Sequence, residues 1–334
     1  MAEQPAALRR LAAANFPNLG ELAGSTWDRI VLTGMGSSLF AGIPTWRALT
    51  ALGHQVWNID TGQLLDNLGL VTPDTLLIIT SQSGASGEVV ELLNRRDEGQ
   101  ITPALVIGIS DDQGSALARS ADVFLPLHSG AEATVSTKSY LNSLAVHRIL
   151  IGHFSRTAPD YVVDDLYLTA DVIAETLSTV DLTAAAVATA QHPSRRLAYV
   201  GRKDEAATAK FSALITKESS KVPAEGFVGG QFRHGPFELA GDGLTVVLFG
   251  MHADDPDRSL HVLAQDLITA GSRVVVIGDT DVPGAQTVQM NPANGLGRLA
   301  AGSVAAELFA VDLARANNVV PGAFLYGSKI TTTV

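Results

Sequence analysis

The stretch that decides the fold is Leu76–Leu93, LLIITSQSGASGEVVELL. It begins with an unbroken apolar run, as in a buried strand, and ends with apolar residues at helical spacing. The turn between them carries four polar side chains, Ser81, Gln82, Ser83 and Ser86, and is neither a G-x-G-x-x-G nor a Gly-Lys-Ser/Thr phosphate loop. Open α/β sheets bind ligands at such turns, so the stretch predicts both an α/β fold and a ligand site.

The composition predicts a globular protein of two domains. The chain has 334 residues, of which 46% are hydrophobic and 17% are charged. No apolar run reaches the 18 residues of a membrane span, and the N-terminus lacks the apolar core of a secretory signal. Since the chain has no cysteine, we expect a cytoplasmic protein without disulfides or thiolate metal sites.

The charge and the histidines argue against nucleic acid and metal ions as binding partners. The net charge is −11, from 23 basic and 34 acidic residues, which disfavours nucleic acid as a partner. The eight histidines show no metal-binding spacing, because His147 and His153 are six residues apart and H-E-x-x-H is absent. We therefore expect no nucleic acid, no membrane and no metal. A small phosphate remains possible, since backbone N–H groups at a helix start bind anions.

Short β-branched runs alternate with longer helical patterns in both halves of the chain. This alternation is typical of a mostly parallel sheet with helices on both faces. Strands are predicted at Arg29–Thr33, Thr75–Thr80, Ala104–Ile109 and Asp122–Leu127, and again at Arg196–Val200, Leu244–Phe249 and Arg273–Ile277.

Equivalent positions in the predicted strands recur at an almost constant distance along the chain. The recurrence predicts two copies of one α/β domain, residues 1–165 and 166–334. The offset is 167 residues from Val31 to Ala198, 169 from Leu77 to Val246 and 169 from Val106 to Val275.

Helices are expected outside the alternating segments. A first helix should begin near Pro5, because proline suits the first helical turn. Helical periodicity from His147 to Ala190 predicts linking helices between the copies. A long apolar helix should run from Leu299 to Asn317 and be followed by an irregular tail.

The copies differ at the turns that would face a ligand. The first copy has three hydroxyl-rich turns, whereas the second has charged residues at the matching places. Hydroxyls and helix N-termini favour anions, so only the first copy is equipped for one. The alternative is that each serine simply caps a helix. Three such turns in one copy favour the phosphate site. The turns are Gly34–Gly42, Ser81–Ser86 and Thr134–Ser139, against Gly201–Glu205 and Gly250–Asp255.

These stretches resemble the sugar isomerase (SIS) domain family, specifically its tandem-domain branch. That branch includes the isomerase half of glucosamine-6-phosphate synthase, hexosamine-phosphate deaminases and Amadori-phosphate deglycases. The resemblance implies two tandem SIS domains, each a flavodoxin- or Rossmann-like three-layer sandwich. It is carried by Gly34–Ser38, Ser81–Gly84, Ser136–Lys138, by Glu218 sixteen residues before His234-Gly235-Pro236, and by Lys329.

The resemblance implies a role for each of these residues and no cofactor. Glu218 matches the base that moves a proton between the first two sugar carbons. His234 matches a ring-opening histidine that serves the neighbouring subunit, which implies a homodimer. Lys329 matches a lysine that meets the sugar carbonyl or its imine. The substrate phosphate would be bound by Ser37, Ser38, Ser81, Gln82, Ser83, Ser86 and Ser136.

Each assignment has an alternative in the residues themselves. Glu218 could be a solvated helix end, His234 could organise a turn, and Lys329 could be mobile in the tail. The chain also departs from its relatives, because Ile215 replaces a lysine that synthase-like and deaminase-like members usually carry. Members without that lysine are deglycases. The expected function is therefore a phosphosugar isomerase or deaminase, with a deglycase or a non-catalytic sugar-phosphate-binding regulator as alternatives.

Overall fold

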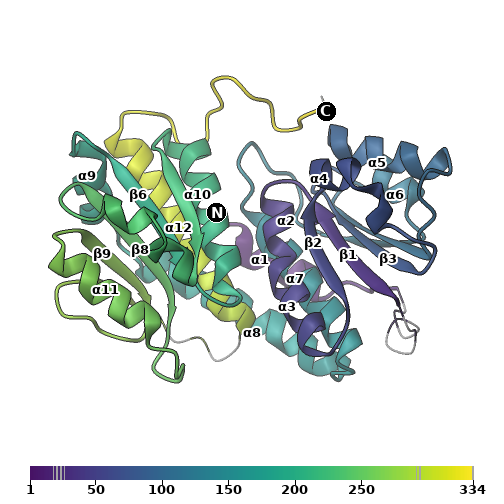
Figure 1. The fold of residues 1–334 in the computed structure, drawn as a ribbon, viewed down its shortest axis with the longest axis horizontal. Coiled ribbons are helices and arrows are strands. Elements are labelled where there is room, and N and C mark those ends of the chain that lie inside the picture. Colours follow the sequence, from purple (N-terminus) through teal and green to yellow (C-terminus); the bar gives the residue numbers. More distant parts are fainter. Residues whose placement is uncertain are drawn as a thin grey trace. The chain divides into compact units, whose positions relative to one another are not determined.

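The computed structural model shows an α/β fold with two parallel five-stranded sheets (Figure 1). It describes residues 1–334 except 18, 20, 21, 23, 24, 26, 291, 293, 294, 333 and 334. The chain forms two compact units, which we call the first unit (Glu3–Ala170 with Tyr326–Val334) and the second unit (Asp171–Leu325 with Met1–Ala2). The predicted domain boundary after residue 165 stays a prediction.

The sheet of the first unit has the order β2-β1-β3-β4-β5 and is parallel throughout. Its central strand is buried at all six positions, which suits a strand with helices on both faces. Each large apolar side chain buried there stabilises the fold by about 1.5–3 kcal/mol. The strands are β1 (Arg29–Gly34), β2 (Val56–Asp60), β3 (Thr75–Thr80), β4 (Leu105–Ser110) and β5 (Val123–Pro126).

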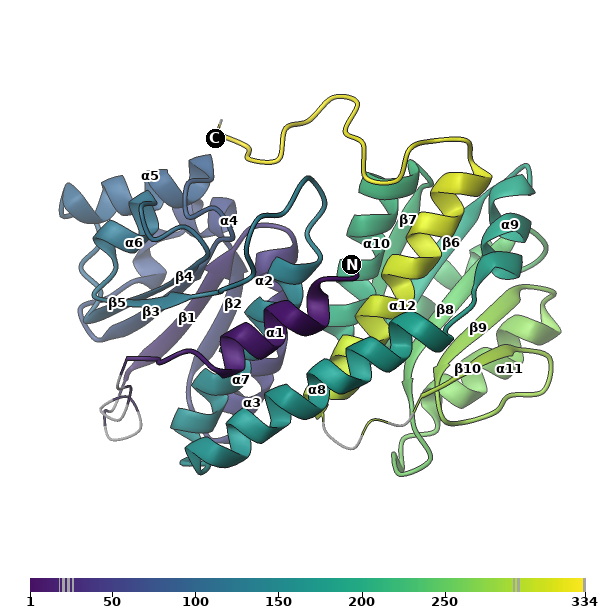
Figure 2. The ribbon, with the colours of Figure 1, turned by 180° about the vertical axis from the view of Figure 1, so that it is seen from behind.

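Helices cover both faces of the first sheet (Figures 1 and 2). The apolar residues of α4 (Thr61–Asp66), α5 (Gly87–Asp97) and α6 (Ala116–Ser120) pack with alternate residues of β1, β3 and β4. A second group packs around α7 and covers the opposite face. It consists of α1 (Gln4–Ala12), α2 (Ser37–Ala41), α3 (Ile43–Ala51) and α7 (Lys138–Phe154). A short 3-10 turn, η2 (Leu68–Leu70), precedes β3.

The sheet of the second unit has the order β10-β9-β8-β6-β7, which is the order of the first sheet read from the other edge. Helix α11 (Ser259–Thr269) packs on one face with the 3-10 turns η3 (Gly229–Arg233) and η4 (Pro236–Leu239). Helices α9 (Thr183–Gln191), α10 (Glu205–Ser220) and α12 (Gly295–Ala316) form the other layer. The strands are β6 (Arg196–Gly201), β7 (Ala224–Val228), β8 (Leu244–Met251), β9 (Arg273–Gly278) and β10 (Gln286–Gln289).

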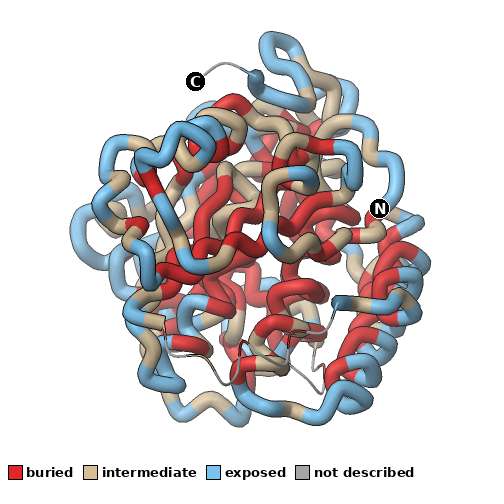
Figure 3. Tube along the Cα trace, turned by 90° about the vertical axis from the view of Figure 1, so that its right-hand side faces the viewer, coloured by how far each residue is buried: buried red, intermediate tan, exposed pale blue. Residues whose placement is uncertain are grey.

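Burial follows this layering in each unit. Buried residues gather in the strands, and exposed ones follow the loops and outer helix faces (Figure 3). Helix α8 (Pro159–Thr179) leads from the first unit into the second. Among the described residues, no single helix is long and apolar enough to cross a membrane. Helices α8 and α9 meet that criterion only as a pair, bent by 63°.

All seven predicted strands are present, within a residue or two of their predicted ends. The predicted helices are also present, although α12 begins at Gly295 rather than Leu299. Three strands were missed, β2, β7 and β10.

Candidate functional site

The turn after β3 is closed by its own side chains. The Ser81 hydroxyl accepts the N–H of Gly84 at 3.1 Å, and the Ser83 hydroxyl accepts the N–H of Ala85 at 3.2 Å. Ser81 is only 6% exposed. Gly84 has a φ of +60°, and a Cβ there would lie 2.2 Å from the hydroxyl oxygen of Ser115. The turn therefore needs glycine at this position, because a side chain has neither the conformation nor the space.

Ser86 occupies the cap position of α5 without acting as a cap. It is the N-cap residue, yet its side chain accepts no hydrogen bond from the start of the helix. Helix α5 has 11 residues and begins directly after this turn. Its dipole therefore places a partial positive charge at the turn. The capping alternative for Ser86 is therefore not realised in this structure, and its hydroxyl is available to a ligand.

The turn after β1 lies beside the turn after β3. Strands β1 and β3 pair directly, with Gly34 opposite Thr80, so their following turns share one edge of the sheet. A Cβ on Gly34 would lie 2.6 Å from the carbonyl oxygen of Thr80, which explains the glycine. Ser37 and Ser38 are half-buried at the start of α2. The structure thus brings the two predicted phosphate-binding turns together.

The third predicted turn is organised by Glu132. Its carboxylate accepts the N–H of Thr137 at 2.8 Å and the hydroxyl of Ser139 at 2.5 Å. Lys138 is buried and pairs with the Glu3 carboxylate at 2.6 Å, so it holds the N-terminus rather than facing a ligand. Ser136 is half-buried within this turn. Glu132 was not predicted, because it lies five residues before Thr137, the N-cap residue of α7, and matches no capping pattern.

Lys329 lies at the same turn. Its ammonium donates to the carbonyl of Glu132 and is 3.8 Å from the Glu132 carboxylate. Burial lowers the pKa of Lys329, and Glu132 partly opposes this. Two residues later, the carbonyl of Thr331 accepts the N–H of Gly87, the first residue of α5, at 2.9 Å. The tail is thus attached to the elements that carry the predicted phosphate-binding residues, contrary to the mobile alternative for Lys329.

Glu218 lies in the last turn of α10 and is largely shielded from water. Burial raises the pKa of its carboxyl to about 6, while Lys221 and Lys217 act in the opposite direction. Ile215 lies one helical turn earlier and is 1% exposed. A lysine at this position would add to the lowering effect of Lys221 and Lys217 on the Glu218 pKa, and the apolar Ile215 does not. A carboxyl group with a pKa near neutrality is better suited to proton transfer than a solvated carboxyl group with an ordinary pKa.

Glu218 and His234 lie on segments that pack against opposite faces of the second sheet. Helix α10 lies on the face of Tyr199, whose hydroxyl is 2.7 Å from that of Thr216. The neighbours of Tyr199 in β6 point the other way and pack with Phe232 of η3. His234 follows two residues later and is exposed. The structure therefore does not bring Glu218 and His234 of one chain together.

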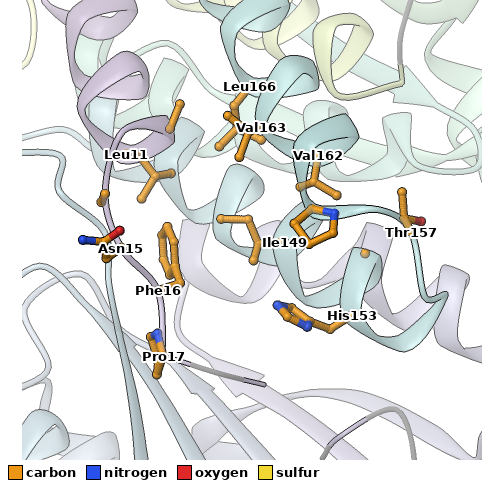
Figure 4. Close-up of a pocket in the computed structure, with 14 residues that line it drawn as sticks. Leu11, Asn15, Phe16, Pro17, Ile149, His153, Thr157, Val162, Val163 and Leu166 are labelled. Atoms are coloured by element: carbon orange, nitrogen blue, oxygen red, sulfur yellow. The ribbon is translucent and has the colours of Figure 1, made fainter. Parts of the chain in front are cut away.

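The first unit also contains an apolar cavity of about 290 Å³ that is lined by none of the predicted site residues. Leu11 and Phe16 lie on one side, and Ile149 and Val162 of α7 and α8 lie on the other (Figure 4). His153 also lines it, and burial lowers its pKa. The cavity offers shape and apolar surface but few groups that could take part in a reaction.

Part of the chain matches a known domain family. Residues 25–151 match the family model described as "SIS domain", so this part of the chain is a SIS domain. The resemblance drawn from the sequence motifs is confirmed there.

The similarity to curated proteins and solved structures extends over most of the chain. The chain is 28% identical over 298 residues to the glutamine–fructose-6-phosphate aminotransferase (isomerizing) of Streptococcus pneumoniae, covering 84% of this chain and 48% of that protein. It thus spans about half the length of the curated relatives it matches.

Two solved structures share the fold. The C-terminal domain of glucosamine-fructose-6-phosphate aminotransferase from Francisella tularensis has a TM-score of 0.82 at 17% identity, over 95% of this chain and 94% of that one. The glucosamine-6-phosphate deaminase of Thermotoga maritima has a TM-score of 0.75 at 18% identity, over 98% and 97%. At these identities the likeness establishes the architecture alone.

Proposed function

We propose that the chain is a cofactor-free enzyme of the isomerase or deaminase type that acts on a phosphorylated amino sugar or a sugar-amine conjugate. Its relation to phosphosugar isomerases of the SIS family supports the reaction class. One observation carries the proposal further. The serine turns after β1 and β3 share one sheet edge, and Lys329 is attached to the elements that carry the other predicted phosphate-binding residues.

In this proposal the first unit binds the substrate phosphate. The hydroxyls of Ser37, Ser38, Ser83 and Ser86 would donate to its oxygens, with help from the N-terminus of α5. Gln82 and Ser136 would complete the contacts, and the buried Ser81 would hold the turn in shape. Such binding orients the sugar without touching the reacting carbons, so its free energy can position them.

The reacting end of the sugar would be handled by the three predicted catalytic residues. His234 would open the ring by moving a proton between the ring oxygen and the anomeric hydroxyl. Glu218 would take the proton from one of the first two carbons and return it to the other, which converts a ketose to an aldose without net consumption of a proton. Lys329 would contact the carbonyl or condense with it to form an imine and water.

His234 would act in the site of a neighbouring copy. Its exposure, and its place on the sheet face opposite to Glu218, support a homodimer in which each copy lends its histidine to the other. We also propose that the second unit is a second SIS domain, because its strand order matches that of the first and its strands recur 167 to 169 residues later. A small sugar phosphate in the cytoplasm would be the ligand.

A specific observation favours a second candidate, an Amadori-product 6-phosphate deglycase. Ile215 is buried where synthase-like and deaminase-like relatives carry a lysine, and relatives without that lysine are deglycases. In that reaction Glu218 and His234 would assist cleavage of a C–N bond to release an amine. Lys329 weighs against it, since deglycases commonly lack the terminal lysine.

The proposal is tested with fructose 6-phosphate, glucosamine 6-phosphate and a fructosyl-amino-acid 6-phosphate in deuterated water. We expect deuterium at the first or second carbon of a substrate, with ammonia or amine release distinguishing deaminase from deglycase. The Glu218→Gln variant should lose both signals, whereas the exposed control Glu225→Gln should keep them. Binding without exchange or product, unaffected by Glu218→Gln, would instead identify a regulator.

A further inference from the structure

A second cavity opens in the second unit, at the carboxyl ends of β6 and β8. It has a volume of about 270 Å³. These strands are neighbours, with Gly201 opposite Phe249, and they hold the same places in their sheet as β1 and β3 hold in the first. The chain leaves β6 for α10 on one face and β8 for α11 on the other. Ligands of open α/β sheets bind at such a point.

Glu205, the first residue of α10, lines this cavity as a buried carboxyl. It is 9% exposed, and burial raises its pKa to about 7. The Thr208 hydroxyl is nearby and partly offsets this, but neither it nor Glu205 Oε2 has a hydrogen-bond partner of normal geometry among the described residues. Gly250 has a φ of +81°, and a Cβ there would lie 2.8 Å from Glu205 Cγ. The backbone thus makes room for this carboxyl group. Among the described residues no Lys or Arg forms an ion pair with it, although Arg298 is close enough to lower its pKa.

His252 lines the same cavity and is also incompletely paired. It is 8% exposed, and its Nδ1 has no hydrogen-bond partner among the described residues. The closest carboxylate oxygen, from Asp279, is 3.8 Å away. Burial lowers the pKa of His252, and Arg298 acts in the same direction. A ring nitrogen without a partner can accept a hydrogen bond when the imidazole is neutral. Two buried groups with unused capacity therefore meet at one cavity.

The cations around this cavity are already used. Five carboxylates and three Lys or Arg side chains line it, so the balance disfavours an anion. Each cation has an acidic partner. The pairs are Arg202 with Asp257 at 3.1 Å, Lys203 with Asp255 at 2.8 Å and Arg298 with Asp254 at 2.8 Å.

The backbone of the helix start is used as well. The N–H groups of Glu205, Ala206 and Ala207 donate to the carbonyls of the three preceding residues, at 3.0, 3.3 and 2.9 Å. The anion-binding capacity of a helix N-terminus depends on such N–H groups being free. This cavity therefore differs in chemistry from the hydroxyl turns of the first unit, despite its equivalent position.

We propose that this cavity is a second ligand site, which binds a small polar molecule through a primary ammonium group. The Glu205 carboxylate pairs with the ammonium, and the His252 imidazole accepts a second of its N–H bonds. A buried carboxylate without a cationic partner favours the binding of a cation, because the ion pair compensates for the hydration that the carboxylate loses on burial. The volume admits a molecule of the size of an amino sugar. The site is separate from the residues assigned to turnover.

Calorimetric titration of the full chain tests this with glucosamine and ethanolamine as amines. N-acetylglucosamine is the matched probe without an ammonium group, and inorganic phosphate is the anionic probe. We expect the amines to bind and N-acetylglucosamine not to bind. Phosphate can bind the serine turns proposed for the first unit, so any phosphate binding should be unchanged by Glu205→Gln. Glu205→Gln, which keeps the shape of the side chain, should weaken amine binding about tenfold or more, and His252→Gln should weaken it as well.

Two control variants locate the binding. Glu225→Gln removes an exposed carboxylate of the same unit and should leave the affinity unchanged. Glu218→Gln should also leave it unchanged, because that residue belongs to the site proposed for turnover. Melting temperatures confirm that each variant is folded. The proposal is overturned if neither amine binds at about 10 mM, if N-acetylglucosamine binds as well as glucosamine, if Glu205→Gln weakens phosphate binding as much as amine binding, or if the loss follows Glu218→Gln rather than Glu205→Gln.

Discussion

Glu218 and His234 belong to segments on opposite faces of one sheet, although sixteen residues separate them in the sequence. Helix α10 holds Glu218 on the face of Tyr199, and Phe232 anchors the His234 segment in the apolar cluster on the other face. Contacts of Phe232 with Phe227 at 5.2 Å and Phe237 at 6.3 Å between ring centres fix that segment. One chain cannot bring both residues to one substrate while this packing lasts.

This arrangement predicts complementation between two inactive variants. Glu218→Gln and His234→Ala should each abolish turnover of the substrate. If His234 serves the partner's site, then unfolding and refolding the two together should restore about a quarter of the wild-type activity, because half of the dimers are mixed and each has one intact site. A mixture that forms mixed dimers, shown by differently tagged chains, yet stays inactive would contradict the shared site.

The raised pKa of Glu218 predicts a pH dependence. Burial moves this pKa from its ordinary 4.5 to about 6, so the folded state binds a proton more tightly than the unfolded state. The free energy of unfolding should therefore fall by about 1–2 kcal/mol as the pH rises from 4.5 to 6, relative to Glu218→Gln. Turnover needs the carboxylate and should rise over the same window. Carbon-13 NMR of labelled glutamate measures the pKa directly, and a value near 4.5 would show that burial does not control it.

The position of Ile215 leads to a prediction of how a lysine there would change the pKa of Glu218. In Ile215→Lys an ammonium one helical turn before Glu218 should bring the Glu218 pKa back toward 4.5. The variant should also lose about 2–4 kcal/mol of stability, since it replaces a buried apolar side chain with a charged one. Ile215→Met, which keeps volume and polarity, is the control and should leave the pKa near 6. Equal pKa values in the two variants would refute an electrostatic role for this position.

Gly84 predicts a strict requirement for glycine in the turn after β3. Gly84→Ala should lower the free energy of unfolding by about 3 kcal/mol or more, since it places a side chain at a residue with positive φ and brings the new Cβ into a clash with Ser115. Gly99→Ala is the matched control, because its φ is +74° but nothing lies within 4 Å of the added Cβ. It should cost only about 1 kcal/mol. Denaturant unfolding measures both, and similar losses would mean that the contact with Ser115 is unimportant.

The sequence predicted every strand inside the two sheets and the edge strand β5, and it missed the other three edge strands. β3 and β8 are continuous apolar runs because helices cover both of their faces. β10 lies at an edge, is half exposed and reads QTVQ, and β7 contains an exposed Glu225 and Gly226. The recurrence contained the missing signal. Val56 begins β2 and Ala224 begins β7, 168 residues later, so predicting either strand would have located the other.

The sequence located the serine turns but not the chemistry around them. The sequence alone indicates that Ser81 and Ser86 follow a strand. Because parallel strands end at one edge of the sheet, it also indicates that the serine turns lie at that edge. It does not indicate that Glu132 meets Lys329 or that Glu205 and His252 line one cavity, since these residues lie far apart in the chain. Nor does it indicate that Asp254, Asp255 and Asp257, in the loop after β8, each pair with a cation at the rim of the second cavity.

The most direct test of the account is calorimetric titration of the full chain with fructose 6-phosphate and, for comparison, with fructose. We predict that only the phosphorylated sugar binds. The Ser83→Ala and Ser86→Ala variants should each weaken it by about tenfold to a hundredfold, as expected for a lost hydrogen bond to a charged group. The exposed Ser178→Ala control should not weaken it. Equal affinity for fructose, or binding unchanged in both turn variants, would contradict the claim that these serines hold a sugar phosphate.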